Sequence, residues 1–386
     1  MRSALLITVD YPPQRGGVAV YLSRLVERFP VGKIQVLAQT NKDRAAHEMD
    51  MNSPAPIYRR RLLRRWLKPG WLPALYWADW VCRKEGNPSV LIVSHLLPLG
   101  EVAYWLNRRR GIPYVVILHG MDAALALSSG RRKRANATRI LARAALVAAN
   151  SEQTARLAET FGVPKDKIVI VRPSPEFPLN YSVPAARTEA VRARYGLDGH
   201  FSVLSVGRLV ARKNFDVVVR AAAELKRQGV KIKLIIAGDG PERATLAKLA
   251  QDLGAGDDVA FAGAVPDDEL AALYSACDVM VMAPKSRGAD VEGFGIVYLE
   301  AALFGKPAVG SRAGGVPEAV LHEKTGLLVE PGDVQGTAAA LKRLADDPGL
   351  RQRLGQAGRQ RVLEEFGWPR QARIFMAALD EIARDK

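Results

Sequence analysis

Two glutamates eight positions apart bracket a short glycine-rich turn in the stretch EGFGIVYLE. Glu292 lies in a predicted loop, and the apolar run behind it predicts a helix that starts near Ile296 and carries Glu300 one turn inside. An acid in an otherwise apolar helix is costly unless it has a partner. The pattern therefore favours two ligand-binding carboxylates over a loop acid followed by an accidental helical one.

The chemistry of this segment suits a nucleotide sugar. Carboxylates accept hydrogen bonds from the vicinal hydroxyls of a sugar or a ribose. The backbone N–H groups of Phe294, Gly295 and Ile296, at the start of the predicted helix, can hold a phosphate. We therefore expect a sugar at Glu292, a phosphate at the helix start and a ribose at Glu300.

Two cations upstream would complement such a diphosphate. In GRLVARKN, Arg208 directly follows a predicted strand, and Lys213 comes five residues later, near the next helix. A guanidinium and an ammonium in one loop suit a diphosphate, although a solvated surface loop could carry them too. Near the amino end, Gly16 and Gly17 open a helix where the missing Cβ would let a phosphate approach the backbone. The alternative there is an ordinary strand-to-helix turn.

His119 is a further candidate because it ends the predicted strand of PYVVILHG. A buried histidine with satisfied hydrogen bonds would also fit, but the carboxyl end of a strand favours a functional role. The other histidines lack metal-ligand spacing and there is no Asp-x-Asp triplet, so we expect neither a metal nor another cofactor. AGDGPER has Arg243 where a dinucleotide fingerprint needs glycine.

Short apolar runs that alternate with helical patterns must position these residues. Continuous apolarity indicates strands buried on both faces, as in parallel sheets covered by helices. The runs cover residues 4–10, 33–39, 89–95, 113–120, 146–151, 167–173, 201–209, 233–240, 259–265, 278–284, 307–315 and 325–331. Six precede the proline-bearing stretch 174–190 and six follow it, so we predict an α/β fold with two doubly wound, Rossmann-like domains facing across a cleft.

Composition and charge narrow the setting. A chain of 386 residues exceeds one ordinary core, and its two cysteines, Cys82 and Cys277, lie in apolar contexts that suit a reducing, cytoplasmic compartment. The amino end does not resemble a signal peptide, and no apolar run reaches the ~18 residues of a membrane span. The net charge of +16 is uneven, because residues 1–176 hold 28 basic and 13 acidic side chains. We therefore expect that half to face something anionic.

The segment YRRRLLRRWLKPGW, residues 58–71, predicts a short basic amphipathic helix that ends at Pro69. One face would carry Leu62, Leu63, Trp66 and Leu67, and the other Arg60, Arg61, Arg64, Arg65 and Lys68. With Trp66 at its edge, such a helix suits an anionic membrane surface. The alternative is a solvated helix that packs its leucines onto its own domain. Nucleic acid is not expected as a partner, since no recognition module is present.

Taken together, EGFGIVYLE, the upstream GRLVARKN, RGGVAVY at the amino end and HG after the fourth run resemble the large fourth family of retaining glycosyltransferases. The resemblance covers nearly the whole chain and implies the two-domain GT-B fold. Residues 1–176 would bind the acceptor, residues 177–367 would bind the nucleotide sugar, and a final helix, 368–386, would cross back onto the first domain. RPSPEFP at 172–178 departs from the Asn-Gly-Val-Asp type of turn in many relatives.

The resemblance also implies a role for each matching residue. The donor-binding set is Gly16, Gly17, Arg208, Lys213, Val265, Glu292, Phe294, Gly295, Ile296 and Glu300, with Val265 meeting the base through its backbone. His119 would lie beside the sugar, and the catalytic set would be His119, Glu292, Arg208 and Lys213. Arg208 and Lys213 would stabilise charge on the leaving diphosphate in place of a metal. The leaving phosphate would take the acceptor's proton, and the anomeric configuration would be retained.

Within that family, SRGADVEGFGIVYLEAALFGKP and RAGGVPEAV are most similar to bacterial phosphatidylinositol-mannoside mannosyltransferases. That similarity implies GDP-mannose as donor, a lipid-linked or glycan acceptor, and a peripheral position on the cytoplasmic face of the membrane. The first alternative is a UDP-sugar-dependent glycosyltransferase of polysaccharide or lipopolysaccharide synthesis. A glycoside hydrolase that uses Glu292 and Glu300 as its acid pair, a nucleotide-sugar epimerase and a non-enzymatic binding module also remain open.

Overall fold

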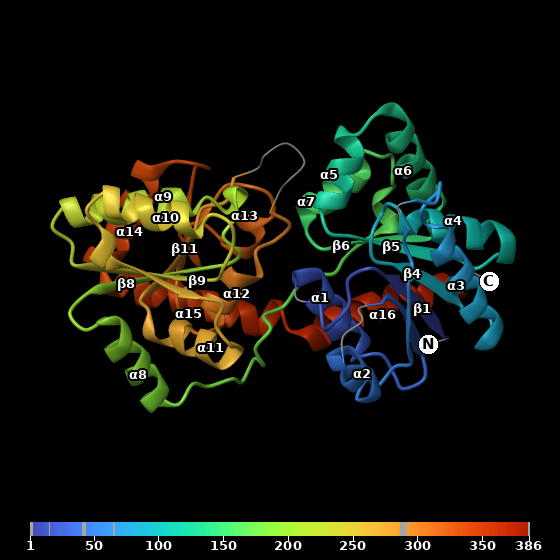
Figure 1. The fold of residues 1–386 in the computed structure, drawn as a ribbon, viewed down its shortest axis with the longest axis horizontal. Coiled ribbons are helices and arrows are strands. Elements are labelled where there is room, and N and C mark those ends of the chain that lie inside the picture. The colour runs from blue at the N-terminus through green and yellow to red at the C-terminus, as the bar shows by residue number, and fades with distance from the viewer. Residues whose placement is uncertain (1–2, 15, 41–43, 65, 286–291, 385–386) are drawn as a thin grey trace. The chain divides into compact units, whose positions relative to one another are not determined.

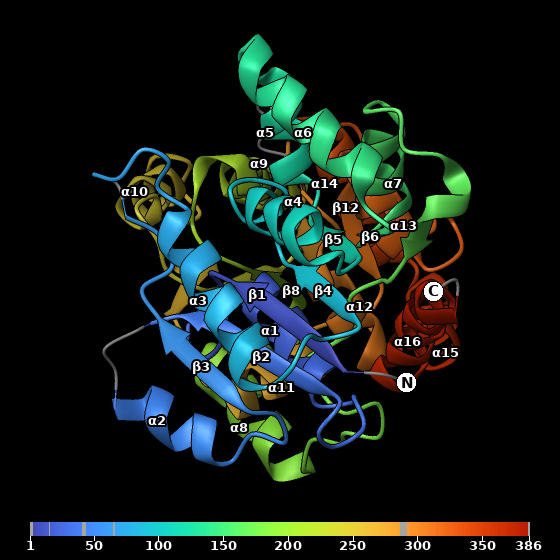
Figure 2. The same cartoon turned by 90° about the vertical axis from the view of Figure 1, so that its right-hand side faces the viewer.

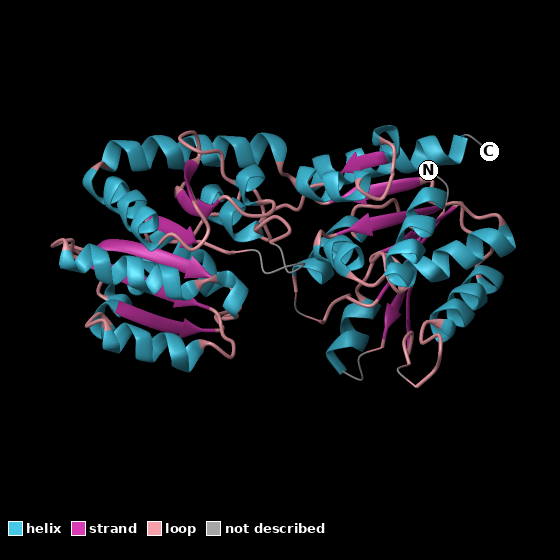
Figure 3. Ribbon diagram, turned by 90° about the horizontal axis from the view of Figure 1, so that it is seen from above, coloured by secondary structure: helices cyan, strands magenta, loops and turns pink. Residues whose placement is uncertain are grey.

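The computed structural model describes residues 3–14, 16–40, 44–64, 66–285 and 292–384. The chain forms two compact units, a first unit of Met1–Ser174 with Trp368–Lys386 and a second unit of Pro175–Gly367. Each unit is built around a sheet with helices against both faces (Figure 1 and Figure 3). The fold is therefore α/β, as the continuous apolar runs predict.

The sheet of the first unit has seven strands in the order β3-β2-β1-β4-β5-β6-β7, all parallel (Figure 2). The strands are β1 Ala4–Thr8, β2 Ile34–Gln39, β3 Ile57–Arg60, β4 Val90–Val93, β5 Tyr114–Leu118, β6 Leu146–Ala149 and β7 Ile168–Ile170. The strand order reverses between β1 and β4, so the carboxyl ends of these two strands form the switch point where such sheets bind ligands.

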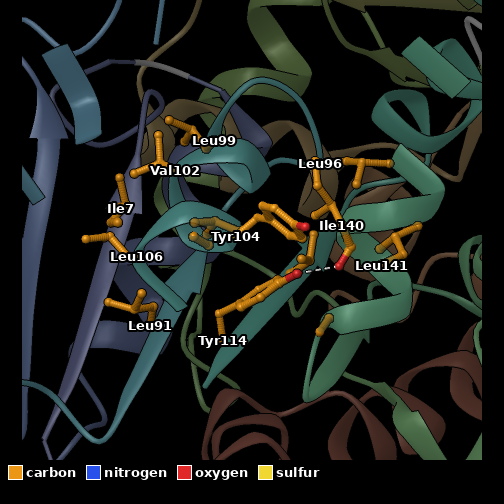
Figure 4. Packing of buried hydrophobic residues seen from close by; sticks show 14 of the residues in the cluster. Ile7, Leu91, Leu96, Leu99, Val102, Tyr104, Leu106, Tyr114, Ile140 and Leu141 are labelled. Atoms are coloured by element: carbon orange, nitrogen blue, oxygen red, sulfur yellow. Dashed lines mark hydrogen bonds between the residues drawn. The ribbon is translucent and has the colours of Figure 1, made fainter. Parts of the chain in front are cut away.

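Helices cover both faces of this sheet because its strands are apolar on both sides. They are α1 Gly17–Val26, α2 Arg44–Met51, α3 Leu72–Lys84, α4 Leu99–Arg110, α5 Met121–Ser128, α6 Arg131–Arg143, α7 Glu152–Glu159 and α16 Trp368–Arg384. On one face Tyr104 of α4, Ile140 of α6 and strand residues such as Tyr114 belong to one buried cluster (Figure 4). The buried Tyr114 hydroxyl donates to the Ile140 carbonyl, which ties α6 to β5.

The helix α16 completes the opposite face of the first sheet. Its side chains Trp368 and Phe375 are buried in the cluster that contains Tyr21 and Phe29 of the amino-terminal region. The rings of Tyr21 and Trp368 lie 5.5 Å apart, and those of Phe29 and Phe375 lie 6.4 Å apart. The last helix of the chain is therefore part of the first unit's core.

The second unit repeats the pattern with six parallel strands in the order β10-β9-β8-β11-β12-β13. They are β8 Phe201–Val206, β9 Ile232–Ala237, β10 Val259–Gly263, β11 Val279–Met282, β12 Ala308–Ser311 and β13 Gly326–Val329. The helices are α8 Ala185–Tyr195, α9 Phe215–Arg227, α10 Arg243–Asp252, α11 Asp267–Ala276, α12 Ile296–Leu303, α13 Val316–Ala319, α14 Val334–Asp346 and α15 Pro348–Glu365. Its switch point lies between β8 and β11.

Each predicted apolar run overlaps one of these strands, but β3 was not predicted, and the predicted helix over residues 58–68 is wrong. β3 pairs with β2 at the edge of the sheet, and no described residue from 61 to 68 is helical. The Leu62 N–H donates to Gln39 Oε1 at 3.0 Å, and the Leu62 side chain is fully buried. The segment gains ladder hydrogen bonds and a core contact that a surface helix would forgo.

Candidate active site

Near the switch point of the second unit, the structure brings an acid and two cations together. Oε2 of Glu292 accepts hydrogen bonds from Lys213 Nζ at 2.7 Å and from Arg212 Nη1 at 2.8 Å. The two cations belong to the short 3₁₀ turn Ala211–Lys213 that precedes α9. Lys213 was predicted from the sequence to bind the diphosphate, whereas Arg212, which directly precedes it, was not predicted as a site residue.

The charge state of Glu292 follows from these contacts. Only 11% of its side chain and 12% of the Lys213 side chain are exposed. Burial favours a higher pKa for Glu292, but the charges of Lys213 and Arg212 outweigh it and hold the pKa below its usual value. Glu292 is therefore a buried carboxylate anion, able to accept hydrogen bonds.

Arg208 lies on the same loop and remains open to solvent. It follows β8 by two residues, and its side chain is exposed. Among the described residues its guanidinium has no hydrogen-bond or ion-pair partner. Its five N–H donors are thus available to an anionic ligand.

The turn between Glu292 and α12 needs glycine for steric reasons. Gly295 caps α12 with φ of 89°, and a Cβ there would lie 2.6 Å from the Tyr298 ring. Phe294 is buried, and its ring lies 5.8 Å from that of Phe366. Phe294 therefore anchors the turn in the core, while the backbone from Gly295 to Ile296 forms the amino end of the helix.

The helical acid Glu300 has the partners that its burial demands. Only 4% of it is exposed, and its Oε2 accepts a hydrogen bond from the Tyr274 hydroxyl at 2.9 Å. Its Oε1 accepts from the Glu176 N–H at 3.4 Å. Burial, followed by the charge of Glu176, raises the pKa of Glu300 to about 7. Tyr274 and Glu176 were not predicted from the sequence, because neither lies in a motif with Glu300.

The remaining donor candidates are glycines of the first unit and a valine of the second. Gly16 caps α1, Gly17 is its first residue, and a Cβ on Gly16 would meet nothing within 4 Å. The backbone at this helix start therefore has room for a ligand. Val265 follows β10 and packs, partly buried, against the core of the second unit.

His119 lies at the carboxyl end of β5 in the first unit. Its backbone N–H donates to Asp122 Oδ1 at 3.0 Å, and its ring meets the Tyr21 ring edge-on at 5.5 Å. Its Nε2 is buried without a hydrogen-bond partner among the described residues. Burial, with the nearby charge of His95, lowers the pKa of His119 to about 4. His119 is therefore neutral near pH 7.

A second histidine belongs to this site and was not predicted. His95 Nε2 lies 3.2 Å from Asp10 Oδ2, and the ring centres of His95 and His119 lie 5.6 Å apart. The hydrogen bond to His95 lowers the pKa of Asp10. A usable signal was present, because His95 follows β4 as His119 follows β5, and both strands end at the same edge of the sheet.

Beside these histidines the first unit contains a cavity of about 520 Å³. Its polar lining includes His95, His119 and Asp122, and its apolar lining includes Leu97 and Leu125. Sites for small ligands usually have volumes of about 300–1,000 Å³, with mostly apolar walls and a few polar groups. The cavity thus has the size and lining of a ligand site.

Three of the residues predicted to face a membrane are exposed: Arg61, Trp66 and Lys68. The Arg64 guanidinium lies 5.3 Å from the centre of the Trp66 ring. Arg60 is instead half-buried, 4.7 Å from the centre of the Trp77 ring. Arg65 lies outside the described residues. Across the described parts of the chain, no helix is long and apolar enough to cross a membrane, and no cluster of His, Cys, Asp and Glu could hold a metal ion.

Comparison with known proteins decides the family. Residues 188–361 match the family "Glycosyl transferases group 1", and residues 16–174 match "Glycosyl transferase 4-like domain". The chain belongs to the group 1 glycosyltransferases. The resemblance on which the motifs were interpreted is confirmed, and the protein is an enzyme of that class.

Several curated relatives of this glycosyltransferase are mannosyltransferases. It is 35% identical over 372 residues, 94% of each chain, to the GDP-mannose-dependent alpha-(1-6)-phosphatidylinositol monomannoside mannosyltransferase of Mycolicibacterium smegmatis. A mannosyltransferase of Corynebacterium glutamicum is 28% identical over 95% of each chain. The D-inositol 3-phosphate glycosyltransferase of Pseudarthrobacter chlorophenolicus is 36% identical over 75% of this chain and 71% of its own.

Solved structures confirm the GT-B fold of the glycosyltransferase. Anabaena Alr3699/HepE in complex with UDP matches with a TM-score of 0.83 at 20% identity, over 98% of this chain and all of that one. The sucrose-phosphate synthase of Thermosynechococcus elongatus matches over the full length of both chains, with a TM-score of 0.79 at 22% identity. At these identities the likeness concerns the fold alone.

Proposed function

We propose that this glycosyltransferase transfers mannose from GDP-mannose to a lipid-linked acceptor of the phosphatidylinositol-mannoside kind. The observation that carries the proposal is the 35% identity over 94% of both chains to a GDP-mannose-dependent phosphatidylinositol monomannoside mannosyltransferase. Identity at that level spans both units, so it includes the region that would bind the acceptor as well as the region that would bind the donor.

The geometry of the second unit supports a nucleotide-sugar donor. Glu292 is an anion that can accept hydrogen bonds from sugar hydroxyls. Glu300 is buried and bonded to Tyr274 and to the Glu176 N–H, so a ribose diol would replace one of these partners at a carboxyl oxygen. Arg208 offers an exposed, unpaired guanidinium among the described residues for the diphosphate. The Lys213 ammonium is bonded to the Glu292 carboxylate, so both side chains would contact the donor at the same place.

We propose further that the reaction retains the anomeric configuration and needs no metal. The negative charge that grows on the leaving diphosphate would be stabilised by Arg208, by Lys213 and by the amino ends of α1 and α12. His119, neutral near pH 7, would place an uncharged imidazole beside the sugar. The leaving phosphate would accept the proton of the attacking hydroxyl, so no side chain is assigned as a base.

A donor panel with a chelator tests these points together. The purified enzyme in EDTA would receive GDP-mannose, UDP-glucose or UDP-galactose with phosphatidylinositol monomannoside, and the product anomer would be read by NMR. We expect an α-mannoside from GDP-mannose alone. Glu292→Gln should lower kcat by about 10²-fold, while Glu330→Gln, at a side chain that is 70% exposed, should not. Transfer from a UDP-sugar would favour the UDP-sugar-dependent alternative, and hydrolysis of a glycan without any nucleotide would favour a hydrolase.

We also propose that the first unit rests on an anionic membrane surface, as a protein of the cytoplasmic face. Large apolar side chains are exposed at Trp66 (68%) and Tyr76 (60%), and Arg61, Arg64 and Lys68 lie close to Trp66 in the sequence. Aromatic and basic side chains together suit an anionic lipid interface. The protein should co-sediment with vesicles that contain phosphatidylinositol. Trp66→Ser should weaken this binding, and binding unchanged in that variant would refute the assignment.

A further inference from the structure

We propose that the cavity of the first unit holds the acceptor as an amphiphile, with one acyl chain against helix α5 and the acceptor phosphate at the basic amino end of α6. This inference rests on the proposed function and specifies which part of the acceptor meets which wall. It assigns to the cavity a lipid chain, in addition to the sugar or inositol head group.

The floor of the cavity is polar. His95 and His119 follow β4 and β5, and Asp122 accepts hydrogen bonds from the backbone N–H groups of His119 and Leu96. Asp10 adds a carboxylate to His95 at 3.2 Å. Because these groups converge at the carboxyl ends of strands beside the switch point, the floor is where a hydroxylated head group would be recognised.

One wall is apolar and uncovered. Met121 and Leu125 lie one turn apart on α5, line the cavity, and are 47% and 49% exposed. Leu97 and Pro98 lie in the same lining. Each methylene group of an acyl chain that becomes buried against such a wall would raise the affinity for the acceptor by about fourfold. A sugar alone would leave these side chains in contact with water.

The rim carries positive charge for a phosphate. Lys133 lines the cavity, and it stands in the first turn of α6 beside the exposed residues Arg131, Arg132 and Arg134. None of the four forms an ion pair with another described residue. The one other acid in the lining, Glu101, is bonded to Arg139 at 2.9 Å and so does not neutralise the rim.

Polar floor, apolar wall and basic rim within one cavity select an anionic amphiphile. A free inositol phosphate would use the floor and the rim only, and a neutral lipid would use the wall only. The donor's sugar would use the floor only. The occupant that uses all three surfaces is a phospholipid whose head group carries the reacting hydroxyl.

Two acceptors with the same head group separate these possibilities. One would be a phosphatidylinositol monomannoside with short acyl chains, kept below its micelle concentration, and the other its deacylated glycerophospho form. Monomeric acceptors remove any contribution from membrane docking. We expect kcat/KM of the wild-type enzyme to be at least tenfold higher for the acylated acceptor.

The variant Leu125→Glu, with Met121→Gln as a second substitution on the same wall, should reduce that ratio towards one, because it should lower kcat/KM for the acylated acceptor more than for the deacylated one. Val31→Glu, at a residue 85% exposed elsewhere in the first unit, is the matched control. Lys133→Ala should lower kcat/KM for both acceptors by a similar factor. Circular dichroism would verify that each variant is folded.

The outcomes are distinct from those of the proposed function. Equal kcat/KM for the two acceptors in the wild type would overturn the acyl-chain site and leave mannosyl transfer standing. The same holds if Leu125→Glu and Val31→Glu behave alike. If neither acceptor receives mannose while another acceptor does, the proposed function itself fails. A higher kcat/KM for the deacylated acceptor would assign the cavity to a soluble inositol phosphate.

Discussion

Removal of the Lys213 ammonium should destabilise the second unit because Glu292 would lose one of its two cationic partners. Lys213→Met keeps most of the apolar stem. Leaving one charge of a buried pair alone costs about 3–5 kcal/mol. Arg212 stays at 2.8 Å, so we expect a loss of about 2–3 kcal/mol, below that range. For a unit of this size the thermal midpoint should fall by roughly 4–12 °C.

A double-mutant cycle that combines Lys213→Met with Glu292→Gln tests whether loss of this ion pair causes the loss of stability. The double variant removes both charges, so its loss of stability should be smaller than the sum of the two single losses by about 1–3 kcal/mol. A coupling energy below about 0.5 kcal/mol would refute the reasoning, because it would mean that Lys213 stabilises the unit independently of Glu292.

The distribution of tryptophan supplies the assay. All six tryptophans lie in the first unit: Trp66, Trp71, Trp77, Trp80, Trp105 and Trp368. Tryptophan fluorescence therefore follows the first unit, whereas far-UV circular dichroism follows both. Lys213→Met should shift a transition seen by circular dichroism and leave the fluorescence midpoint where it is. A shifted fluorescence midpoint would contradict a local effect on the second unit.

Glu300 has a pKa of about 7 in the fold, above the ordinary glutamate value of 4.5, so the folded state binds its proton more tightly. The second unit should therefore lose up to roughly 3 kcal/mol as pH rises from about 4.5 to 7, and Glu300→Gln should remove that loss in melts at pH 5 and pH 8. Gly238→Ala would put a Cβ 2.0 Å from the Gly207 carbonyl oxygen at φ of 136°. Gly254 has φ of 68° and open space around it, so Gly254→Ala should lower the free energy of unfolding by only ~1 kcal/mol, and Gly238→Ala should lower it by more. Equal urea midpoints for the two variants would contradict this. Phe375→Ala in α16 should cost about 3–5 kcal/mol and lower the fluorescence midpoint, whereas a shift seen only by circular dichroism would argue against its place in the first core.

The parts of the fold that follow from sequence are those in which every residue of a segment has the same environment. β5, Tyr114–Leu118, is buried along its whole length, so its apolar run is unambiguous. β3 could not be predicted in this way, because it is an edge strand, IYRR, that is half-exposed along its length. Its arginines continue a pattern that is also typical of a surface helix. The same arginines led to the incorrect helix at 58–68.

The site was predictable where residues lie in one motif and not where they meet across the fold. The distance between Glu292 and Lys213 depends on how β8 and β11 are placed side by side, which no spacing along the chain contains. Tyr274 is 26 residues from Glu300 on a different helix, so their hydrogen bond could not be predicted from a sequence motif. The type of each residue indicated its chemistry, but it did not indicate which residue it would contact.

The place of α16 has a consequence for biosynthesis. On the ribosome, the first 174 residues emerge before the helix that completes their core, because the whole of Pro175–Gly367 is translated in between. At about 5–20 residues per second that interval lasts roughly 10–40 s. During it, the apolar surface that Trp368 and Phe375 later cover around Tyr21 and Phe29 is open on the nascent chain. The nascent first unit should therefore need protection by a chaperone until the last helix arrives.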